Sequence, residues 1–498
     1  MLSKNIVGIA LLIATNFSHY VKAVNIDFFN HLIEINENRM LIDRNNLLVT
    51  DLGDTEIFKF KLQYEYKSFA NDIIVIDNYA KNDESKRENS ILQYAYDAAT
   101  NSIDIDIKGI ESTQLDLDII IQLSHTLLNN SNQVAQSLSE DVQFMYFPIN
   151  KLPLTNYHID KFESTLMNLV PGSNRKLKFS DGEETFIKLK EDGEYILKTA
   201  VTDLNANFDE MPEAINVYFE FSTALLTVKK IIRNVYLSHW SNTIHFDEHY
   251  IIQNEAPKLA KTFKRKEYMT YQSLNQGGTG LALSQLDVLL PIGSFDHYYK
   301  DDLGMITTMK TAHHPRTNFD TLALKPRYPI LGSWNYIFNI GWFNKLEQFS
   351  HFLESSRHTE NQEFLLELPV VDGANNLIYQ DVTVNVVLPE GVKIKSIYAP
   401  DLNMLPGNDR KPKIEFNKFE NLFDYSEDKS TEIKITYSDV SINSNLLRLE
   451  NSDNKIFIKY EVNNFKVYYE KVLRLAVWIF VGLVSIYLLG IINDNLQK

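Results

Sequence analysis

Apolar and polar residues alternate with a period of two along many short stretches of the chain. Ile103, Ile105 and Ile107, for example, share one face of the stretch SIDIDIKGI. Strands with one wet and one dry face are typical of antiparallel sheets, and a series of short strands is typical of sandwiches. The pattern predicts a mainly β fold, with β-sandwich-like domains and a few helices. The same alternation occurs in residues 382–391, 391–397, 431–437 and 455–462.

Helical periodicity is scarcer along the chain. The stretches that match a period of 3.6 best are SLSEDVQFMYFPI, residues 137–149, and GWFNKLEQFSHFLESS, residues 341–356. We expect these two stretches to be among the few helices of the fold.

A long apolar run lies near the end of the sequence. The run Leu475–Ile492 contains no charged residue, and at 1.5 Å per residue it nearly reaches across a hydrocarbon core of about 30 Å. Helices of globular proteins are rarely apolar on all sides, which disfavours a buried core helix. The run predicts one C-terminal transmembrane helix at residues 472–492, followed by a short cytosolic tail at residues 493–498.

The first residues have the features of a secretory signal. Lys4 precedes a short apolar stretch at residues 6–14, and Val21 and Ala23 occupy the small-residue positions of a cleavage site. We expect a signal peptide at residues 1–23, cleaved after Ala23. The alternative is a buried N-terminal helix. The two ends together predict a single-pass type I membrane protein, with the bulk of the chain in the lumen.

The segment between the two ends is too long for one typical domain. We expect two β-rich lumenal domains at residues 24–230 and 231–466. Hydrophobic residues make up 44% and charged residues 23% of the chain, as in ordinary globular proteins rather than disordered ones. A net charge of −16 argues against nucleic acid as a partner. Asn129, in the sequence Asn-Asn-Ser, is the candidate N-glycosylation site.

The composition and motifs also restrict the kinds of cross-link and catalysis that the chain can have. The chain has no cysteine, so the lumenal domains are held by their cores rather than by disulfides, and thiol catalysis is excluded. The pattern G-x-S-x-G of a serine hydrolase does not occur.

One stretch carries metal-binding residue types. In TIHFDEHYII, His245, Glu248 and His249 spell H-x-x-E-H, a zinc-peptidase pattern. That site needs a helix, whereas apolar residues here alternate with His245, Asp247 and His249 as on a strand. Four residues of strand would hold the two imidazoles about 13 Å apart, too far for one zinc ion. We favour a strand and keep a zinc peptidase as an alternative.

Other motifs favour structural interpretations. Two D-x-D triplets, 104–106 and 116–118, could share a cation, but the residues between the acids continue an apolar stripe, so a wet strand face is favoured. KPRYP, residues 325–329, is better explained as a rigid turn than as a P-x-x-P ligand. The basic run at residues 258–266 is better explained as a solvated face than as a site for lipid headgroups or an acidic partner.

Several longer stretches resemble one family. VYLSHWSNTIHFDEHY (235–250), LLPIGSFDHYYKDDLGMITT (289–308), LKPRYPILGSWNYIFNIGWFNKL (324–346) and VVLPEGVKI (386–394) are similar to ribophorin I, in its fungal form, over roughly residues 229–492. Lys325, Tyr328, Leu331 and Ser333 depart from the family's usual pattern. The residues that carry the resemblance are Ser238, His239, Trp240, Asp296, His297, Tyr298, Pro326, Arg327, Pro329, Gly332, Trp334, Gly341 and Trp342.

The resemblance implies the alpha subunit of the oligosaccharyltransferase complex of the endoplasmic reticulum membrane. It implies two lumenal β-rich domains, one membrane span, and no catalytic, metal-binding or cofactor-binding residues in this chain. Transfer of the lipid-linked oligosaccharide to Asn-x-Ser/Thr would occur in a separate multi-span subunit. The expected partners are that subunit, small membrane subunits, nascent polypeptides and membrane lipid. An alternative is a type I surface receptor or adhesion protein with tandem sandwiches.

Overall fold

The computed structural model describes most of the chain. The described residues are 24–35, 41–53, 55–63, 70–79, 90–97, 99–108, 114–123, 134–135, 143–168, 178–180, 186–188, 194–197, 201–210, 213–221, 224–274, 281–313, 319–353, 361–371, 377–400, 412–419, 430–438, 442–443, 455–463 and 471–496. The expected signal peptide, the cleavage position Ala23 and the sequon residue Asn129 lie outside these ranges.

The chain forms two compact units. The first comprises Met1–Asn132, Val142–Phe221 and Met404–Asn408, and the second comprises Gln133–Asp141, Ser222–Asn403 and Asp409–Lys498. The expected border between residues 230 and 231 lies inside strand β16 (Leu226–Ser238), which belongs to the second unit. The described residues are mainly in strands, as the alternation of apolar and polar positions predicts.

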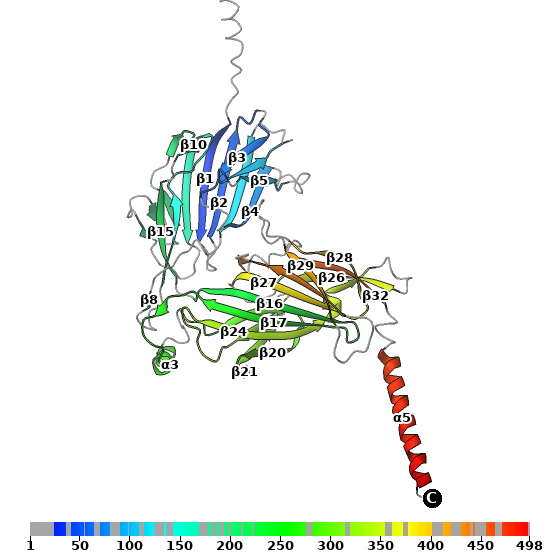
Figure 1. Cartoon of the computed structure of the whole chain (residues 1–498). Coiled ribbons are helices and arrows are strands. Elements are labelled where there is room, and N and C mark those ends of the chain that lie inside the picture. The colour runs from blue at the N-terminus through cyan, green and yellow to red at the C-terminus, as the bar shows by residue number, and fades with distance from the viewer. Residues whose placement is uncertain are drawn as a thin grey trace, which may run out of the picture. The chain divides into compact units, whose positions relative to one another are not determined.

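The first unit is built on an eight-stranded sheet with the order β12-β13-β10-β1-β2-β7-β4, in which β14 also pairs with β10 (Figure 1). Two three-stranded sheets, β11-β15-β9 and β3-β6-β5, accompany it. The strands are β1 (Asn25–Ile35), β2 (Leu41–Thr50), β3 (Ile57–Lys61), β4 (Ala70–Asp77), β5 (Tyr94–Asp97), β6 (Ser102–Asp106), β7 (Gln114–Leu123), β9 (Gln143–Asn150), β10 (His158–Asn168), β11 (Lys178–Phe179), β12 (Phe186–Lys188), β13 (Glu194–Leu197), β14 (Val201–Leu204) and β15 (Ala214–Phe221).

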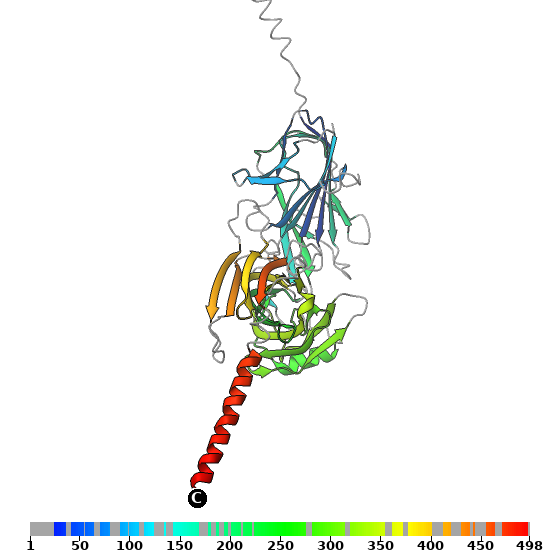
Figure 2. The same ribbon diagram turned by 90° about the vertical axis from the view of Figure 1, so that its right-hand side faces the viewer.

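The second unit is built on a nine-stranded sheet with the order β21-β20-β24-β17-β16-β27-β30-β29, in which β31 pairs with β27. The orange strands β29 and β30 stand at one side of this unit in Figure 2. The strands are β16, β17 (Thr243–Asn254), β20 (Phe295–Asp301), β21 (Gly304–Met305), β24 (Asn335–Lys345), β27 (Ile378–Leu388), β29 (Lys413–Phe419), β30 (Ser430–Tyr437) and β31 (Ile442–Asn443).

Smaller sheets complete the second unit. They have the orders β25-β26-β32-β28, β19-β23-β22 and β18-β8. Their strands are β8 (Val134–Ala135), β18 (Lys258–Leu259), β19 (Leu286–Pro291), β22 (Met309–His313), β23 (Phe319–Leu324), β25 (Ser350–Phe352), β26 (Asn361–Pro369), β28 (Lys393–Tyr398) and β32 (Lys455–Asn463); the helices are α3 (Arg265–Leu274), the 3-10 helix η4 (Leu346–Gln348) and α5 (Lys471–Leu496).

One hydrophobic core joins the nine-stranded sheet to the four-stranded and three-stranded sheets of the second unit. Ile231 on β16, Leu368 on β26 and Ile458 on β32 all contribute to it, and each is fully buried. Two sheets that bury their apolar faces in a common core are the arrangement of a sandwich. Strand pairing is mainly antiparallel, but β1 pairs in parallel with β10, and β16 in parallel with β27.

The prediction of helices at residues 137–149 and 341–356 is wrong. Residues 143–149, the described part of the first candidate, lie in β9, and the second candidate forms the end of β24, η4 and β25. Met145, Phe147 and Ile149 are buried in alternation on β9. Both stretches hold enough alternating apolar positions to join a sheet, and pairing with neighbouring strands outweighs the weak helical period.

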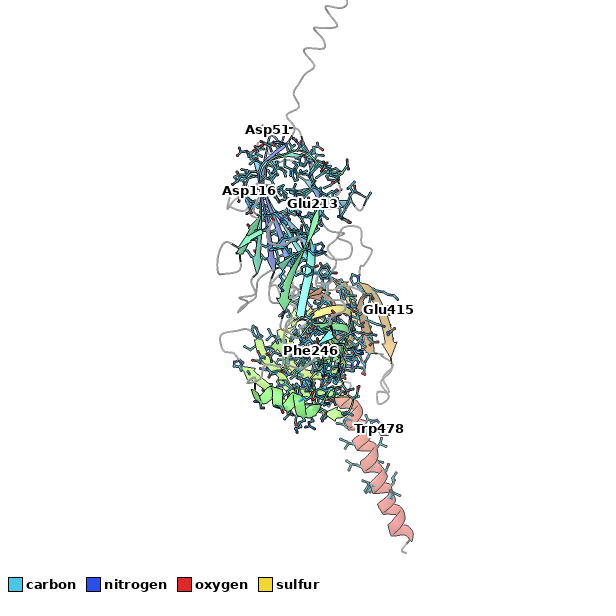
Figure 3. All side chains as sticks on the ribbon, turned by 90° about the vertical axis from the view of Figure 1, so that its left-hand side faces the viewer. Asp51, Asp116, Glu213, Phe246, Glu415 and Trp478 are labelled. Atoms are coloured by element: carbon cyan, nitrogen blue, oxygen red, sulfur yellow. The ribbon has the colours of Figure 1, made fainter. Side chains whose placement is uncertain are left out.

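Helix α5 contains the expected apolar run. Its large apolar side chains are exposed from Val472 to Leu489, and Trp478 projects from the helix in Figure 3. Among the residues that the structure describes, no helix meets the length and apolarity required for crossing a membrane. Residues 493–496, expected to belong to a tail, continue the helix.

Phe246 on β17 is fully buried in the hydrophobic core of the second unit. It is labelled in Figure 3. Its ring stacks on Trp342 with centroids 5.2 Å apart and lies 5.3 Å from the ring of Phe349. We expect Phe246→Ala to lower the free energy of unfolding of the second unit by about 3–5 kcal/mol, because it leaves a cavity. Hydrogen exchange of β17 peptides during urea titration measures the change.

Met305→Ala is the matched control, because the Met305 side chain is 60% exposed. We expect this substitution to change the free energy of unfolding by no more than about 0.5 kcal/mol. Equal effects of the two substitutions would contradict the assignment of Phe246 to the core.

Candidate functional site

The H-x-x-E-H pattern lies on β17, in the middle of the nine-stranded sheet. β17 pairs with β16 on one side and with β24 on the other. His245 and His249 lie on one face of the strand and are partly exposed, whereas Glu248 lies on the opposite face and is fully buried. A zinc peptidase needs these side chains around one ion, so the strand contradicts the zinc interpretation. The predicted strand is confirmed.

The outer face of β17 carries a cluster of half-buried polar and aromatic side chains. The Tyr298 hydroxyl donates a hydrogen bond of 2.5 Å to Oδ1 of Asp247. Asn234 donates to the other carboxylate oxygen over 3.4 Å, and Asn385 donates to Asn234 over 2.9 Å. Burial, together with the hydrogen bond and charge of Asp247, raises the pKa of Tyr298. The cluster links β20, β17, β16 and β27 across the sheet.

Gly341 provides the space that Tyr298 needs. A Cβ atom at this glycine would lie 2.3 Å from two atoms of the Tyr298 ring. Gly341 and Tyr298 are paired residues of β24 and β20, so the ring crosses over Gly341 to reach Asp247. Both residues carry the family resemblance, and the structure gives them one shared packing role.

Two aromatic rings enclose His245 in the same cluster. Its imidazole stacks on Phe343 with ring centroids 4.3 Å apart and on Tyr236 with centroids 5.6 Å apart. Desolvation by burial lowers the pKa of His245, although the charge of Asp247 opposes this shift. The neutral, stacked imidazole is therefore favoured, and it contributes to packing.

The motif around Pro329 and Trp334 is held by Asn254, the last residue of β17. The Asn254 amide nitrogen donates to the carbonyls of Leu281 and Ile330 over 2.7 and 2.9 Å. Its side-chain oxygen accepts from the amides of Leu225 and Ala256 over 3.2 and 3.0 Å. The Asn254 side chain is fully buried, so these four bonds tie separate segments together inside the protein.

Gly332 permits the close approach of this turn to the neighbouring segment. A Cβ atom here would lie 2.0 Å from the carbonyl oxygen of Pro257 and 2.4 Å from that of Ala256. The next residue, Ser333, has a φ of 67° and donates its backbone N–H to the carbonyl of Asn254 over 2.7 Å. This turn follows KPRYP, residues 325–329, for which the rigid turn stays a prediction.

Arg327 connects the same turn to the β20–β21 hairpin. Its Nε donates to Asp301 over 2.8 Å, and one terminal nitrogen donates to the carbonyls of Gly304 and Met305 over 3.2 and 2.8 Å. Pro326 and Pro329, on either side of Arg327, are buried. Arg327 therefore holds the hairpin to this segment.

His239 joins the nine-stranded sheet to the four-stranded sheet. It follows β16 directly, and its Nε2 lies 2.9 Å from the hydroxyl of Tyr460 on β32. The Ser350 hydroxyl lies 2.7 Å from the same Tyr460 oxygen. Desolvation by burial lowers the pKa of His239 from 6.5 to about 4. The imidazole is therefore neutral at physiological pH and acts in a buried hydrogen-bond chain.

The remaining family residues lie in different environments. Trp342 is fully buried in the core, whereas Trp240 and Trp334 are 57% and 36% exposed. Of the three tryptophans, only Trp342 therefore belongs to the core. The Ser238 hydroxyl accepts from the Ser241 amide over 3.2 Å.

Asp296 and His297 form the start of β20. Asp296 adopts a φ of 52°, in the left-handed region, and its side chain is exposed. His297 Nε2 lies 2.9 Å from the Ser294 hydroxyl, and desolvation by burial lowers the pKa of His297. These residues shape the turn that precedes the strand.

The sequence analysis missed a fully buried ionic cluster. Arg233 on β16 and Glu248 on β17 are paired residues, and Arg233 Nε lies 3.5 Å from Glu248 Oε1. The Tyr250 hydroxyl donates to Glu248 Oε2 over 2.7 Å, and the Arg233 guanidinium lies over the Phe246 ring. Burial and the charge of Glu248 raise the pKa of Tyr250 well above its ordinary value. The sequence did contain a signal for this cluster, because Arg233 and Glu248 each occupy a position where the alternation predicts a buried apolar residue.

The first unit contains a Ser–His–Asp arrangement that the sequence analysis also missed. His31 on β1 lies 3.1 Å from the hydroxyl of Ser164 on β10 and 3.0 Å from a carboxylate oxygen of Asp43 on β2. Asn45 donates a further bond of 2.8 Å to Asp43. All four side chains are at most 2% exposed, so no substrate reaches the serine. The arrangement bonds three adjacent strands.

One group in the part of the chain that the structure describes has the spacing of metal ligands. His158, Asp160 and Asp203 offer ligand atoms within 4.8 Å of one another. Their side chains are 40%, 50% and 85% exposed, and acidic groups lie together on surfaces without an ion. The expected absence of a bound metal stays a prediction.

The two D-x-D triplets lie in different sheets, on β6 and β7. Asp104 pairs with Lys59 over 3.3 Å, and Asp116 accepts hydrogen bonds from Asn46 and Asn78 over 2.9 and 3.0 Å. Neighbouring side chains thus contact the carboxylates along the strand, as on a wet face.

Comparisons with known proteins point to one family. The family model described as Ribophorin I matches residues 34–490. The dolichyl-diphosphooligosaccharide–protein glycosyltransferase subunit 1B of Arabidopsis thaliana is 27% identical over 286 residues, 57% of this chain and 56% of that protein. Subunit 1 of Schizosaccharomyces pombe is 27% identical over 186 residues, 37% of this chain and 39% of that protein.

The chain thus spans about half or less of the length of the curated relatives it matches. Among solved structures, native leukotriene A4 hydrolase from Saccharomyces cerevisiae matches with a TM-score of 0.25 at 10% identity, covering 47% of this chain and 28% of that one. So low a score carries no argument about fold or function.

Substitution of Gly341 tests the Tyr298 cluster. We expect Gly341→Ala to lower the free energy of unfolding by about 1–3 kcal/mol, because the new methyl group displaces the Tyr298 ring from Asp247. In a Tyr298→Ala background the space is free, so the same substitution should be nearly neutral. Urea unfolding of the four proteins of this cycle measures the coupling. Additive effects would show that Gly341 and Tyr298 act independently.

The low pKa of His239 predicts a pH dependence of stability. Below pH 6.5 the unfolded chain binds a proton that the folded chain does not bind until about pH 4. Stability is therefore lost as the pH falls from about 6.5 to about 4, by about 3 kcal/mol in total. Urea unfolding at pH 7.5 and 4.5 should show a smaller loss for His239→Gln than for the unsubstituted chain. Equal losses would contradict the assignment.

Proposed function

The chain belongs to the ribophorin I family, and we propose that it is a non-catalytic accessory subunit of the oligosaccharyltransferase complex of the endoplasmic reticulum. The observation that carries this proposal is the family match over residues 34–490, together with relatives named as subunit 1 of the dolichyl-diphosphooligosaccharide–protein glycosyltransferase. The complex would transfer a lipid-linked oligosaccharide to Asn-x-Ser/Thr of nascent polypeptides.

The roles of the family residues support an accessory function. Gly341 makes room for Tyr298, Gly332 allows a backbone contact, and Arg327 bonds a turn to a hairpin. His239 is neutral and buried in a hydrogen-bond chain. Each of these residues stabilises the shape of the second unit, as expected of a subunit that supports a catalyst in another chain.

In this proposal, helix α5 anchors the protein in the membrane. The run Leu475–Ile492 has no charged residue, and the side chains of Phe480, Ile486 and Leu489 are each at least 65% exposed. Burying one such side chain is worth about 1.5–3 kcal/mol, so lipid is a favourable environment for this helix. Residues 1–23 would act as a cleaved signal, and the two units would lie in the lumen in a type I orientation.

The proposed partners follow from the same family assignment. They are a multi-span subunit that carries out the transfer, small membrane subunits beside α5, nascent polypeptides and membrane lipid. The chain itself would supply no metal ligand and no cofactor site for the reaction.

Purification of the tagged full chain in a mild detergent tests the proposal. We expect a multi-span transferase subunit to co-purify in near-stoichiometric amount, as identified by mass spectrometry. The variant Val481→Arg/Ile486→Arg is the matched control, because each charge costs about 2.5–3.5 kcal/mol in the middle of a membrane helix. We expect this variant to lose the membrane partners.

The glycan on Asn129 provides a second readout from the same preparation. A high-mannose glycan at Asn129 is expected for a resident of the endoplasmic reticulum. Golgi-type processing at this residue, with no transferase subunit in the preparation, would replace the proposal with the surface-receptor alternative.

A further inference from the structure

A groove opens in the second unit between the ends of two sheets. β28 is the last strand of the four-stranded sheet, and β29 is the last strand of the nine-stranded sheet. The groove between them has a volume of about 800 Å³. Its apolar lining consists of Val392, Ile394, Ile397, Ile414 and Phe416. The Phe416 side chain, one of these, is 57% exposed.

Both strands beside the groove have an open edge. Within the described ranges, β29 pairs only with β30, and β28 pairs only with β32. The outer N–H and C=O groups of such strands are available to another extended chain. The pairing of β28 is interrupted by an irregularity between Ile394 and Ser396, whereas β29 pairs with β30 in regular register from Lys413 to Phe419. β29, marked by Glu415 in Figure 3, is therefore the better template for an added strand.

The described charges that line the groove have one sign. Lys393, Lys395 and Lys418 contribute to the lining, and no acidic residue in the described part of the chain does. Lys395 pairs with Glu461 over 2.5 Å. Lys393 and Lys418 have no acidic group within ion-pair distance among the residues whose positions are described. Alternate residues of β29, namely Ile414, Phe416 and Lys418, face the groove, so apolar and positive contacts follow each other along the strand.

We propose that this groove binds an extended segment of a partner polypeptide, with apolar groove-facing residues flanked by acidic ones, which adds as a strand to the edge of β29. Backbone hydrogen bonds to β29 would supply affinity, and the alternating lining would select the sequence. Acidic side chains would complement Lys393 and Lys418, and β-branched side chains would cover Ile414 and Phe416. This inference does not depend on the proposed function, although Val392, Lys393 and Ile394 belong to the stretch 386–394 that is similar to the family.

The probe is a fluorescent seven-residue peptide, acetyl-Asp-Thr-Val-Thr-Val-Thr-Asp-amide, whose length equals that of β29. It reads the same in both directions, so it fits a parallel or an antiparallel addition. The full chain in a mild detergent is titrated with the peptide, and binding is followed by fluorescence anisotropy. We expect saturable binding that weakens as salt is added, and no binding of the same peptide with Lys in place of Asp.

Exposed substitutions test the groove without disturbing the fold. Lys393→Glu/Lys418→Glu is expected to weaken binding by about tenfold, because two favourable charge pairs become repulsive. Phe416→Ser should weaken binding as well. Lys310→Glu on β22 and Met305→Ser on β21 are the matched controls, since both side chains are exposed and lie on other strands. We expect the two controls to bind the peptide as the unsubstituted chain does.

Two N-methylated peptides separate strand addition from simple insertion into the groove. Methylating the valine amides or the threonine amides removes opposite sets of N–H donors, and only one set can face β29. Strand addition in one preferred direction predicts that one methylated peptide binds more tightly than the other. Hydrogen exchange should show protection of β29 amides in the bound state.

Three results of these binding experiments would contradict the proposal. Equal binding of the Asp and Lys peptides, the absence of saturable binding, or binding that the groove variants leave unchanged would overturn the proposal. The lysines would then act only to protect two sheet edges from pairing with other chains.

Discussion

The pairing of β16 with β17 is the constraint on which the second unit depends. These strands lie in the middle of the nine-stranded sheet and match residue for residue from Lys230 to Ser238. Their pairing buries Arg233 beside Glu248, and a slip of one residue between the strands would place the two charges on opposite faces of the sheet. Removing one partner of such a buried pair would leave an uncompensated charge, which costs several kcal/mol. The ionic pair therefore adds to the apolar pattern in specifying this register.

The two faces of β17 make different kinds of contact. The inner face carries Phe246, Glu248 and Tyr250 into the core, and the outer face holds Asp247 for the hydroxyl of Tyr298. At its end, Asn254 bonds to segments that lie far apart in the sequence. Three of the residues that identify the family, Tyr298, Gly341 and Trp342, pair with or bond to this central strand. They help to give the unit a defined shape.

Sequence reasoning succeeded where a pattern is local. The alternation around His245 and His249 predicted a strand and so argued against zinc. It failed for residues 143–149 and 341–356, where a weak helical period was outweighed by pairing with strands distant in the sequence. The His31 network and the groove beside Phe416 could not be predicted, because each brings together strands whose order in the sheet the sequence does not specify.

The sequence by itself determined that the chain is mainly β, that a long uncharged run lies near its end, and that it resembles the ribophorin I family. These properties follow from periodicity, composition and motif order, which are local. Only the tertiary structure decided why Gly341 has no side chain, what surrounds Arg233, and which strands end their sheets. Those answers depend on contacts between segments up to hundreds of residues apart, as between His239 and Tyr460. Such contacts arise from strand order and register, which alternation alone leaves open.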